Sequence, residues 1–235
     1  RHPAFDLSRL FGDVGDPMAL FDDDPAAPLS IHAFCRQLKE QGIRVGSWTT
    51  VSQIAPAITS LLAAHHIPVY TPRDSVFNCA DALGLFVEGS PLLCLLPLMC
   101  GHDAFDPRCH EFVGVCVSIP SGLGAIIGKK GNALYLVGHS RNNFLFFDPH
   151  VTHDTALGEE RHEILHNAPL HSVPASGINP SLMLGYIWGS PREMEDDLTI
   201  MAQLPFSPLS IVRSDDIHIV ESHEELDSWE VIDVE

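Results

Sequence analysis

The chain has 235 residues, 45% of them hydrophobic, which is enough to bury the core of one large domain. Its formal net charge of −18 at pH 7 repels phosphate backbones, so we expect no nucleic-acid partner and favour a basic protein partner. The longest apolar run, Pro91 to Cys100, is far shorter than the ~20 residues of a membrane span, so we expect no transmembrane segment.

The first part of the chain predicts an irregular start followed by helices. Residues 1–29 carry Gly, Pro and consecutive Asp without a sustained period, which indicates an irregular acidic lead-in. Ser30 can cap a helix that runs through Glu40 and ends at Gly42. A second, amphipathic helix is expected next, with Ser47, Trp48 and Thr49 in its first turn. Its apolar positions are Val51, Ile54, Ala55, Ile58, Leu61 and Leu62.

The rest of the chain is mainly extended. A turn over 138–143 fits a hairpin, and the segment after Asp106-Pro107 is ambiguous between helix and strand. Ser190 and Glu193 form a capping box that opens a helix toward Gln203. The expected strands are Ile67 to Tyr70, Leu92 to Leu98, Gly124 to Ile127, Ala133 to Val137, Phe144 to Phe147, Pro180 to Trp188 and Ile217 to Val220.

Asp148 and His150 follow a buried strand and flank Pro149, which stops the strand ladder. Strand alternation predicts that both side chains point to the same side. A carboxylate beside an imidazole fixes the tautomer of the ring and stabilises the imidazolium, which is the supporting half of a catalytic triad. The alternative is an Asx turn that closes the strand, with His150 an ordinary surface residue.

Other motifs carry weaker predictions. His162 to His166 matches H-E-x-x-H, but Pro169 follows closely and breaks a helix, so we expect no metal site. Ala125 to Leu134 resembles an RNA-clamping loop, but a glycine-rich hairpin suits its acidic surroundings better. The six cysteines lack a framework spacing, which predicts reduced thiols in a cytosolic protein. They are Cys35, Cys79, Cys94, Cys100, Cys109 and Cys116.

From Ser214 onward the chain has nine acidic residues and no Lys or Arg, which indicates an acidic tail over 214–235. Trp229 and Ile232 lie three residues apart in that tail, where an aromatic and an aliphatic anchor could enter two pockets of a partner protein. The alternative is a strand that folds back onto the domain.

Several blocks in register resemble one family, the autophagins, which are cysteine endopeptidases that process the ubiquitin-like modifier of autophagy. The similar blocks are PLSIHAFCRQLKEQGIRVGSW, VCVSIPSGLGAIIGKKGNALYLVGHSRNNFLFFDPHVTH, INPSLMLGYIWGSPREMEDDL and SWEVI. The resemblance covers the chain from about Leu29 to its end. It implies an α/β, papain-like fold with a central mixed or antiparallel sheet flanked by helices, the protease domain spanning residues 30–213.

The resemblance also implies roles for particular residues. Asp148 and His150 would be the triad acid and base, and Trp48 would cover the nucleophile. Ile119, Pro120 and Ser121 would form a loop that lifts when the modifier's C-terminal tail enters. Trp229 and Ile232 would dock a second copy of the modifier. The family cleaves after a C-terminal glycine and also releases the modifier from phosphatidylethanolamine, so a cytoplasmic thiol protease with transient access to membrane-conjugated modifier and no cofactor is expected.

One departure changes the expected activity. The family's nucleophile lies in a Gly-Trp-Gly-Cys-Met-Leu-Arg segment that this sequence lacks, and none of the six cysteines matches it. We therefore expect that the chain, which starts at Arg1, begins downstream of the nucleophile and is inactive alone. Two alternatives stay open: a pseudoprotease that binds the modifier through its tail, and a protease for the related Ufm-type modifier.

Overall fold

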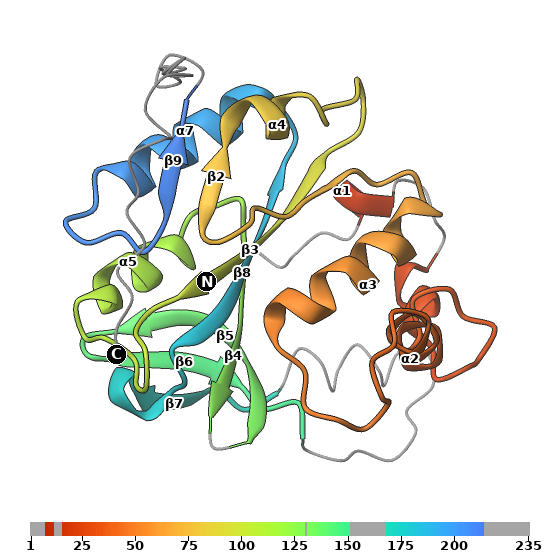
Figure 1. The fold of residues 1–235 in the computed structure, drawn as a ribbon, viewed down its shortest axis with the longest axis horizontal. Helices are drawn as coiled ribbons and strands as arrows, with labels where there is room; N and C mark the ends of the chain where they lie inside the picture. Colours follow the sequence, from red (N-terminus) through yellow and green to blue (C-terminus); the bar gives the residue numbers. More distant parts are fainter. Residues whose placement is uncertain (1–7, 12–15, 130, 151–167, 214–235) are drawn as a thin grey trace, which may run out of the picture.

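The computed structural model describes residues 8–11, 16–129, 131–150 and 168–213, and these build a seven-stranded mixed sheet flanked by helices (Figure 1). The strand order is β1-β3-β8-β4-β5-β6-β7, with β1 parallel to β3 and the other neighbours antiparallel. The strands are β1 (Val69–Tyr70), β3 (Leu92–Met99), β4 (Gly122–Lys129), β5 (Asn132–Ser140), β6 (Asn143–Phe147), β7 (His171–Pro174) and β8 (Ser181–Trp188). The expected α/β class and the predicted strands within these ranges are confirmed.

Both faces of the sheet are buried around β3, whose side chains alternate between two apolar clusters. Leu92, Cys94 and Leu96 face the larger cluster, which includes side chains of α5 (Cys109–Cys116) and α7 (Pro191–Ala202). Leu93 and Leu95 face a smaller cluster under α3 (Val51–Ala63). Strand alternation thus turns a continuous apolar run into a wall between two helical layers.

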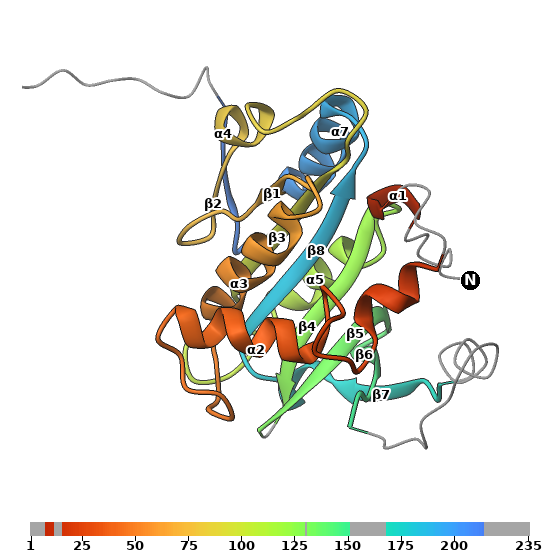
Figure 2. The ribbon, with the colours of Figure 1, turned by 90° about the vertical axis from the view of Figure 1, so that its right-hand side faces the viewer.

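Helices α2 (Ile31–Glu40) and α3 lie across the face formed by β3, β8 and β4 (Figure 2). Ser30 caps α2 as expected, since its hydroxyl accepts the backbone N–H of Ala33 at 3.2 Å. The expected start of α3 is wrong by one turn. Thr50 is its N-cap and its backbone N–H donates to the Gln53 side chain at 2.8 Å, so 47–49 precede the helix. Gly42 and Gly46, both with positive φ, lie in the loop between α2 and α3.

On the opposite face of the sheet, the segment whose sequence is ambiguous between helix and strand forms helix α5. Its β-branched Val113 is fully buried against the sheet, so tertiary burial outweighs β-propensity there. Helix α7 begins at Pro191, and the Ser190 hydroxyl accepts the Glu193 N–H at 3.3 Å, as the capping box predicts. A short helix α4 (Cys79–Leu83) and a parallel two-stranded sheet complete this side. That sheet pairs β2 (Val76–Asn78) with β9 (Ser210–Val212).

The acidic lead-in contains short helical pieces within its described part. These are α1 (Ser8–Phe11) and the 3₁₀ helix η1 (Pro17–Phe21), and a further 3₁₀ turn, η2 (Ala175–Gly177), follows β7. Phe11 packs against the smaller apolar cluster, which ties this segment to the sheet. The domain limits at 30 and 213 stay predictions. The expected strand Ile217 to Val220 and the H-E-x-x-H motif lie outside the described residues.

Two hairpins of the sheet lie at the positions that the sequence predicts. Lys129 pairs with Asn132 in the β4–β5 hairpin, which confirms the glycine-rich hairpin expected there. Ser140 pairs with Asn143 in the β5–β6 hairpin, and Arg141 between them has a positive φ of 53°.

Across the ranges that the structure covers, no helix is long and apolar enough to cross a bilayer.

Candidate active site

The candidate site lies at the end of β6, where the strand stops at Phe147. Asp148 Oδ1 accepts the backbone N–H of His150 at 2.9 Å and lies 2.7 Å from the ring Nδ1 of the same residue. An Asx turn therefore brings the two side chains together. The expectation that strand alternation does this is wrong, because the ladder has ended before Asp148. The Asx turn and the acid–imidazole pair coexist rather than exclude each other.

The contact fixes the tautomer of His150. A carboxylate only accepts hydrogen bonds, so the Nδ1–H of His150 donates to Asp148, and Nε2 carries the lone pair of the neutral ring. The His150 side chain is 47% exposed, so this nitrogen is accessible to a reacting group. The pair can orient a base and stabilise its protonated form.

The Asp148 pKa lies below its ordinary value, first because the His150 backbone N–H donates to the carboxylate and second because the His150 ring does. Replacing His150 with Ala is expected to raise the Asp148 pKa only part of the way, since the backbone donor remains. A carbon-13 titration of the Asp148 carboxyl group would measure this. Complete return to the ordinary value would contradict the Asx turn as the main cause.

The lowered Asp148 pKa also determines the direction in which the stability of the protein changes with pH. Because the folded-state pKa is depressed, the stabilising contribution of Asp148 is present above the unfolded-state pKa of about 3.9 and is lost as pH falls through the folded-state value. The group is partly exposed, which screens this effect.

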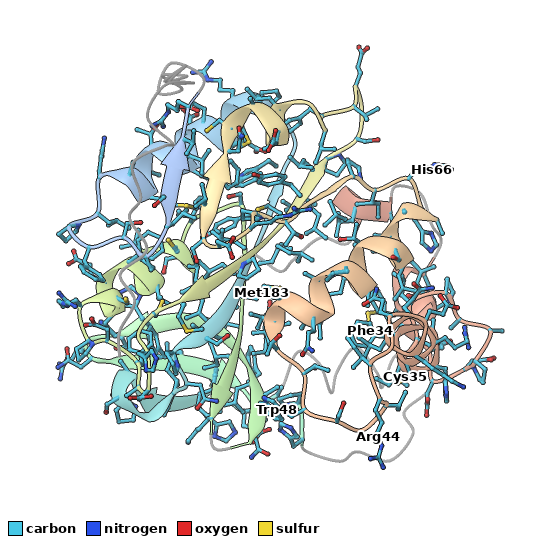
Figure 3. All side chains as sticks on the ribbon, viewed as in Figure 1. Phe34, Cys35, Arg44, Trp48, His66 and Met183 are labelled. Atoms are coloured by element: carbon cyan, nitrogen blue, oxygen red, sulfur yellow. The ribbon has the colours of Figure 1, made fainter. Side chains whose placement is uncertain are left out.

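Trp48 lies on the loop between α2 and α3 and is 62% exposed, which is unusual for so large an apolar side chain. Figure 3 shows it on the same loop as Arg44, whereas Phe34 and Cys35 lie on α2 and Met183 lies beside the start of α3. Among the described residues, no hydrogen bond or ring contact joins Trp48 to Asp148 or His150. The structure therefore presents Trp48 as an exposed side chain that does not join the Asp148–His150 pair.

The Ile119-Pro120-Ser121 segment joins α5 to β4 as a tight turn. The backbone N–H of Gly122 donates to Ile119 O at 2.9 Å, and Pro120 at the second turn position is exposed. Ile119 and Ser121 are 4% and 7% exposed. The segment expected to lift is thus packed against the core at both ends and open only at Pro120.

Sequence reasoning missed the residue that holds this turn, Asp197 of α7. Its Oδ2 accepts hydrogen bonds from the Ser121 hydroxyl and, at 2.7 Å, from Trp188 Nε1. A signal was present in the sequence. Asp197 falls among Met194, Leu198 and Met201 on the apolar side of α7, and a carboxylate there needs buried donors.

The six cysteines, all within the described residues, form no disulfide with one another, and all except the half-buried Cys35 are buried. Burial raises the pKa of the Cys94, Cys100 and Cys109 thiols, and that of Cys116 to about 12. These thiols are therefore held in the protonated, unreactive form. Among the described residues, no thiol is a hydrogen-bond partner of His150.

Within the described ranges, no group of three or more His, Cys, Asp and Glu side chains is arranged to hold a metal ion. Trp229 and Ile232, the expected partner-binding pair, lie outside those ranges.

Comparison with known families decides how this site is classified. The model of the peptidase C54 catalytic domain matches residues 16–199, which is more than half of the chain. The chain belongs to the peptidase C54 family. The C54 match includes Trp48, the Ile119-Pro120-Ser121 turn, Asp148 and His150. Together with the mixed sheet between two helical layers, it confirms the papain-like fold class.

Curated relatives of this C54 chain include cysteine protease ATG4b of Arabidopsis thaliana, which is 25% identical over 211 residues, covering 76% of this chain and 44% of the relative. The probable cysteine protease atg4 of Schizosaccharomyces pombe is 27% identical over 176 residues, covering 72% and 54%. Cysteine protease ATG4A of Gallus gallus is 29% identical over 127 residues, covering 52% and 33%. The chain spans about half or less of the length of these relatives. Their names agree with the resemblance to autophagins.

Proposed function

We propose that this chain is part of a cysteine endopeptidase of autophagy that cleaves a ubiquitin-like modifier after its C-terminal glycine. The observation that carries the proposal is the Asp148–His150 pair, with its 2.7 Å contact and defined tautomer, inside a C54 catalytic domain. Asp148 and His150 are the acid and base of the site in this proposal.

The chemistry follows from the tautomer. His150 Nε2 takes the proton of a cysteine thiol, and the thiolate attacks the carbonyl carbon of the scissile peptide bond. The C–N bond breaks as the protonated His150 gives its proton to the leaving amine, which leaves a thioester. Water then attacks that carbonyl, with His150 accepting a proton, and returns the thiol and a free C-terminal carboxylate. Asp148 orients the ring and stabilises its charge in each step.

The nucleophilic thiol lies outside these 235 residues in this proposal. The burial and raised pKa of Cys94, Cys100, Cys109 and Cys116 support this, since buried thiols are inert. Cys35 is less buried, but it belongs to the body of α2. A pseudoprotease that only binds the modifier is the outcome if the complete protein supplies no reactive thiol.

The substrate side of the proposal rests on the autophagin resemblance. Trp48 would cover the nucleophile, and its exposure leaves it available for that role. The Ile119-Pro120-Ser121 turn would move aside for the modifier tail. Cleavage of the precursor would expose the glycine for lipidation, and cleavage of the conjugate would release the modifier from phosphatidylethanolamine. The lack of a disulfide among the six cysteines of the described residues favours the cytoplasm as the place of action.

The test is cleavage by a form of the protein that contains its nucleophilic cysteine. Precursors of the autophagy modifier and of the Ufm-type modifier would be compared by intact mass spectrometry. Cleavage of the first alone, after its glycine, is expected. Cleavage of the Ufm-type precursor alone would replace the proposed substrate, and binding without cleavage would leave the pseudoprotease.

The acidic tail gives a separate prediction. If Trp229 and Ile232 dock a second copy of the modifier, replacing both with Ala should weaken binding by about 2 kcal/mol or more in titration calorimetry. A variant with Glu224 and Glu225 changed to Gln is the control for charge alone. Unchanged affinity after the loss of both anchors would remove the docking role.

A further inference from the structure

The turn from Ile119 to Gly122 is fastened to two elements that are distant in sequence. The Ile187 backbone N–H on β8 donates to Ser121 O at 3.0 Å, and the Ser121 hydroxyl donates to the Asp197 carboxylate on α7. The same carboxylate oxygen accepts the Trp188 indole N–H at 2.7 Å. One buried oxygen thus connects the turn, the sheet and the helix.

The Asp197 carboxylate receives little hydrogen bonding from solvent. Asp197 is 8% exposed, and the Trp188 side chain is 1% exposed, so solvent scarcely reaches the cluster. The Trp188 ring stacks on Tyr186, with centroids 5.5 Å apart and planes within 8°, which fixes the indole N–H toward the carboxylate. A buried carboxylate is costly unless its donors stay in place. Movement of Ser121 would remove one of the two donors that the described residues supply to this carboxylate.

We propose that Asp197 is a positioning residue that latches the Ile119–Ser121 turn closed against β8 through the Ser121 hydroxyl. The latch deepens, and rests on, the proposed protease function, because this turn would have to move for the modifier tail to enter. Asp197 touches no reacting atom. It sets how often the turn is open, and so the fraction of molecules that are ready to bind substrate.

The geometry also predicts where opening would be seen. We expect the turn to unwind as it lifts, so that the hydrogen bond within it from Gly122 N–H to Ile119 O breaks together with the one from Ile187 N–H to Ser121 O. Both amides then exchange with solvent, while the amides of the β5–β6 hairpin stay protected, because local opening leaves the rest of the sheet intact. These two amides therefore report on the latch without any assay of activity.

The first experiment is hydrogen exchange measured by NMR on the chain with Ser121→Ala, which removes one donor and keeps the carboxylate. The amides of Gly122 and Ile187 are expected to exchange about five- to tenfold faster than in the parent chain. Ser118→Ala is the matched control, since its hydroxyl donates at 2.8 Å to Gly114 O in the preceding helix and does not meet Asp197. Equal exchange in the two variants would overturn the latch, as would uniform acceleration of all sheet amides.

Conservative replacement of the carboxylate separates positioning from packing. Asp197→Asn retains an oxygen that can accept both donors and should keep the exchange rates of the two amides within about twofold of the parent. Asp197→Ala should accelerate them at least as much as Ser121→Ala does. If Asp197→Ala fails to fold, Ser121→Ala still decides the question. Fast local exchange in Asp197→Asn would overturn the role given to its acceptor oxygen.

The second experiment uses the protein with its nucleophilic cysteine. If opening of the turn precedes substrate entry, Ser121→Ala should lower KM by about fivefold with kcat unchanged, and Ser118→Ala should change neither. Faster local exchange with an unchanged KM would leave the latch in place and remove the turn from substrate entry. Loss of cleavage of every modifier by the parent protein would instead count against the proposed function, and the exchange result would stand by itself.

Discussion

Replacing His150 with Ala in a protein that carries its nucleophilic cysteine is expected to lower kcat by roughly 10⁴-fold or more, because the base that deprotonates the thiol is lost. Binding of the modifier should stay within about twofold, since His150 lies beyond the end of β6 and its side chain is 47% exposed. Single-turnover cleavage together with titration calorimetry separates the two effects. Normal turnover of the variant would end the assignment of His150.

The chain offers a matched control for this prediction. His102 and Asp103 form another His–Asp pair, with Nδ1 2.9 Å from the carboxylate, but both side chains are about fully exposed in a loop. His102→Ala should therefore leave kcat and KM unchanged. Asp148→Asn should lower kcat strongly while His150 is retained, because the amide no longer supports the protonated ring. A large loss in His102→Ala would show that the assay responds to surface histidines in general.

Replacing Trp188 with Ala is expected to lower the free energy of unfolding by about 3–5 kcal/mol, because a fully buried indole is removed and a cavity remains. For a chain of this length the melting temperature should fall by roughly 10 °C. Urea denaturation would measure the free energy of unfolding and a thermal scan the melting temperature, both followed by circular dichroism. A loss below about 1 kcal/mol would contradict the packing of Trp188 between Tyr186 and Phe77.

Trp48→Ala is the matched control, since its side chain is 62% exposed, and its stability should stay within about 0.5 kcal/mol. Trp188→Phe keeps a ring but removes the N–H donor to Asp197. This variant is expected to lower the free energy of unfolding by about 1–3 kcal/mol. Burial raises the Asp197 pKa above its ordinary value of about 3.9. The contribution of this group to the free energy of unfolding is therefore fully present at a pH below that ordinary value, and it declines as pH rises through the folded-state pKa. The Trp188→Phe loss should therefore be larger at pH 7 than in acid.

The sequence predicted much of the secondary structure because local signals dominate there. Ser30 and the Ser190–Glu193 capping box marked helix starts, and these starts are confirmed. The apolar run of β3 was predicted as a buried strand because continuous hydrophobicity suits a strand covered on both faces. The start of α3 was misplaced, since its apolar period does not show where the cap lies and Thr50 decides this.

By itself, the sequence determined the α/β class, most strand positions and the pairing of Asp148 with His150, because residues two apart meet in an Asx turn as readily as on a strand. Only the tertiary structure decided that 109–116 is a helix and that the Ile119–Ser121 turn is held by a carboxylate 76 residues away from Ser121. Those outcomes depend on burial against the sheet and on the position of α7. Contacts between distant segments follow from packing, which no local pattern encodes.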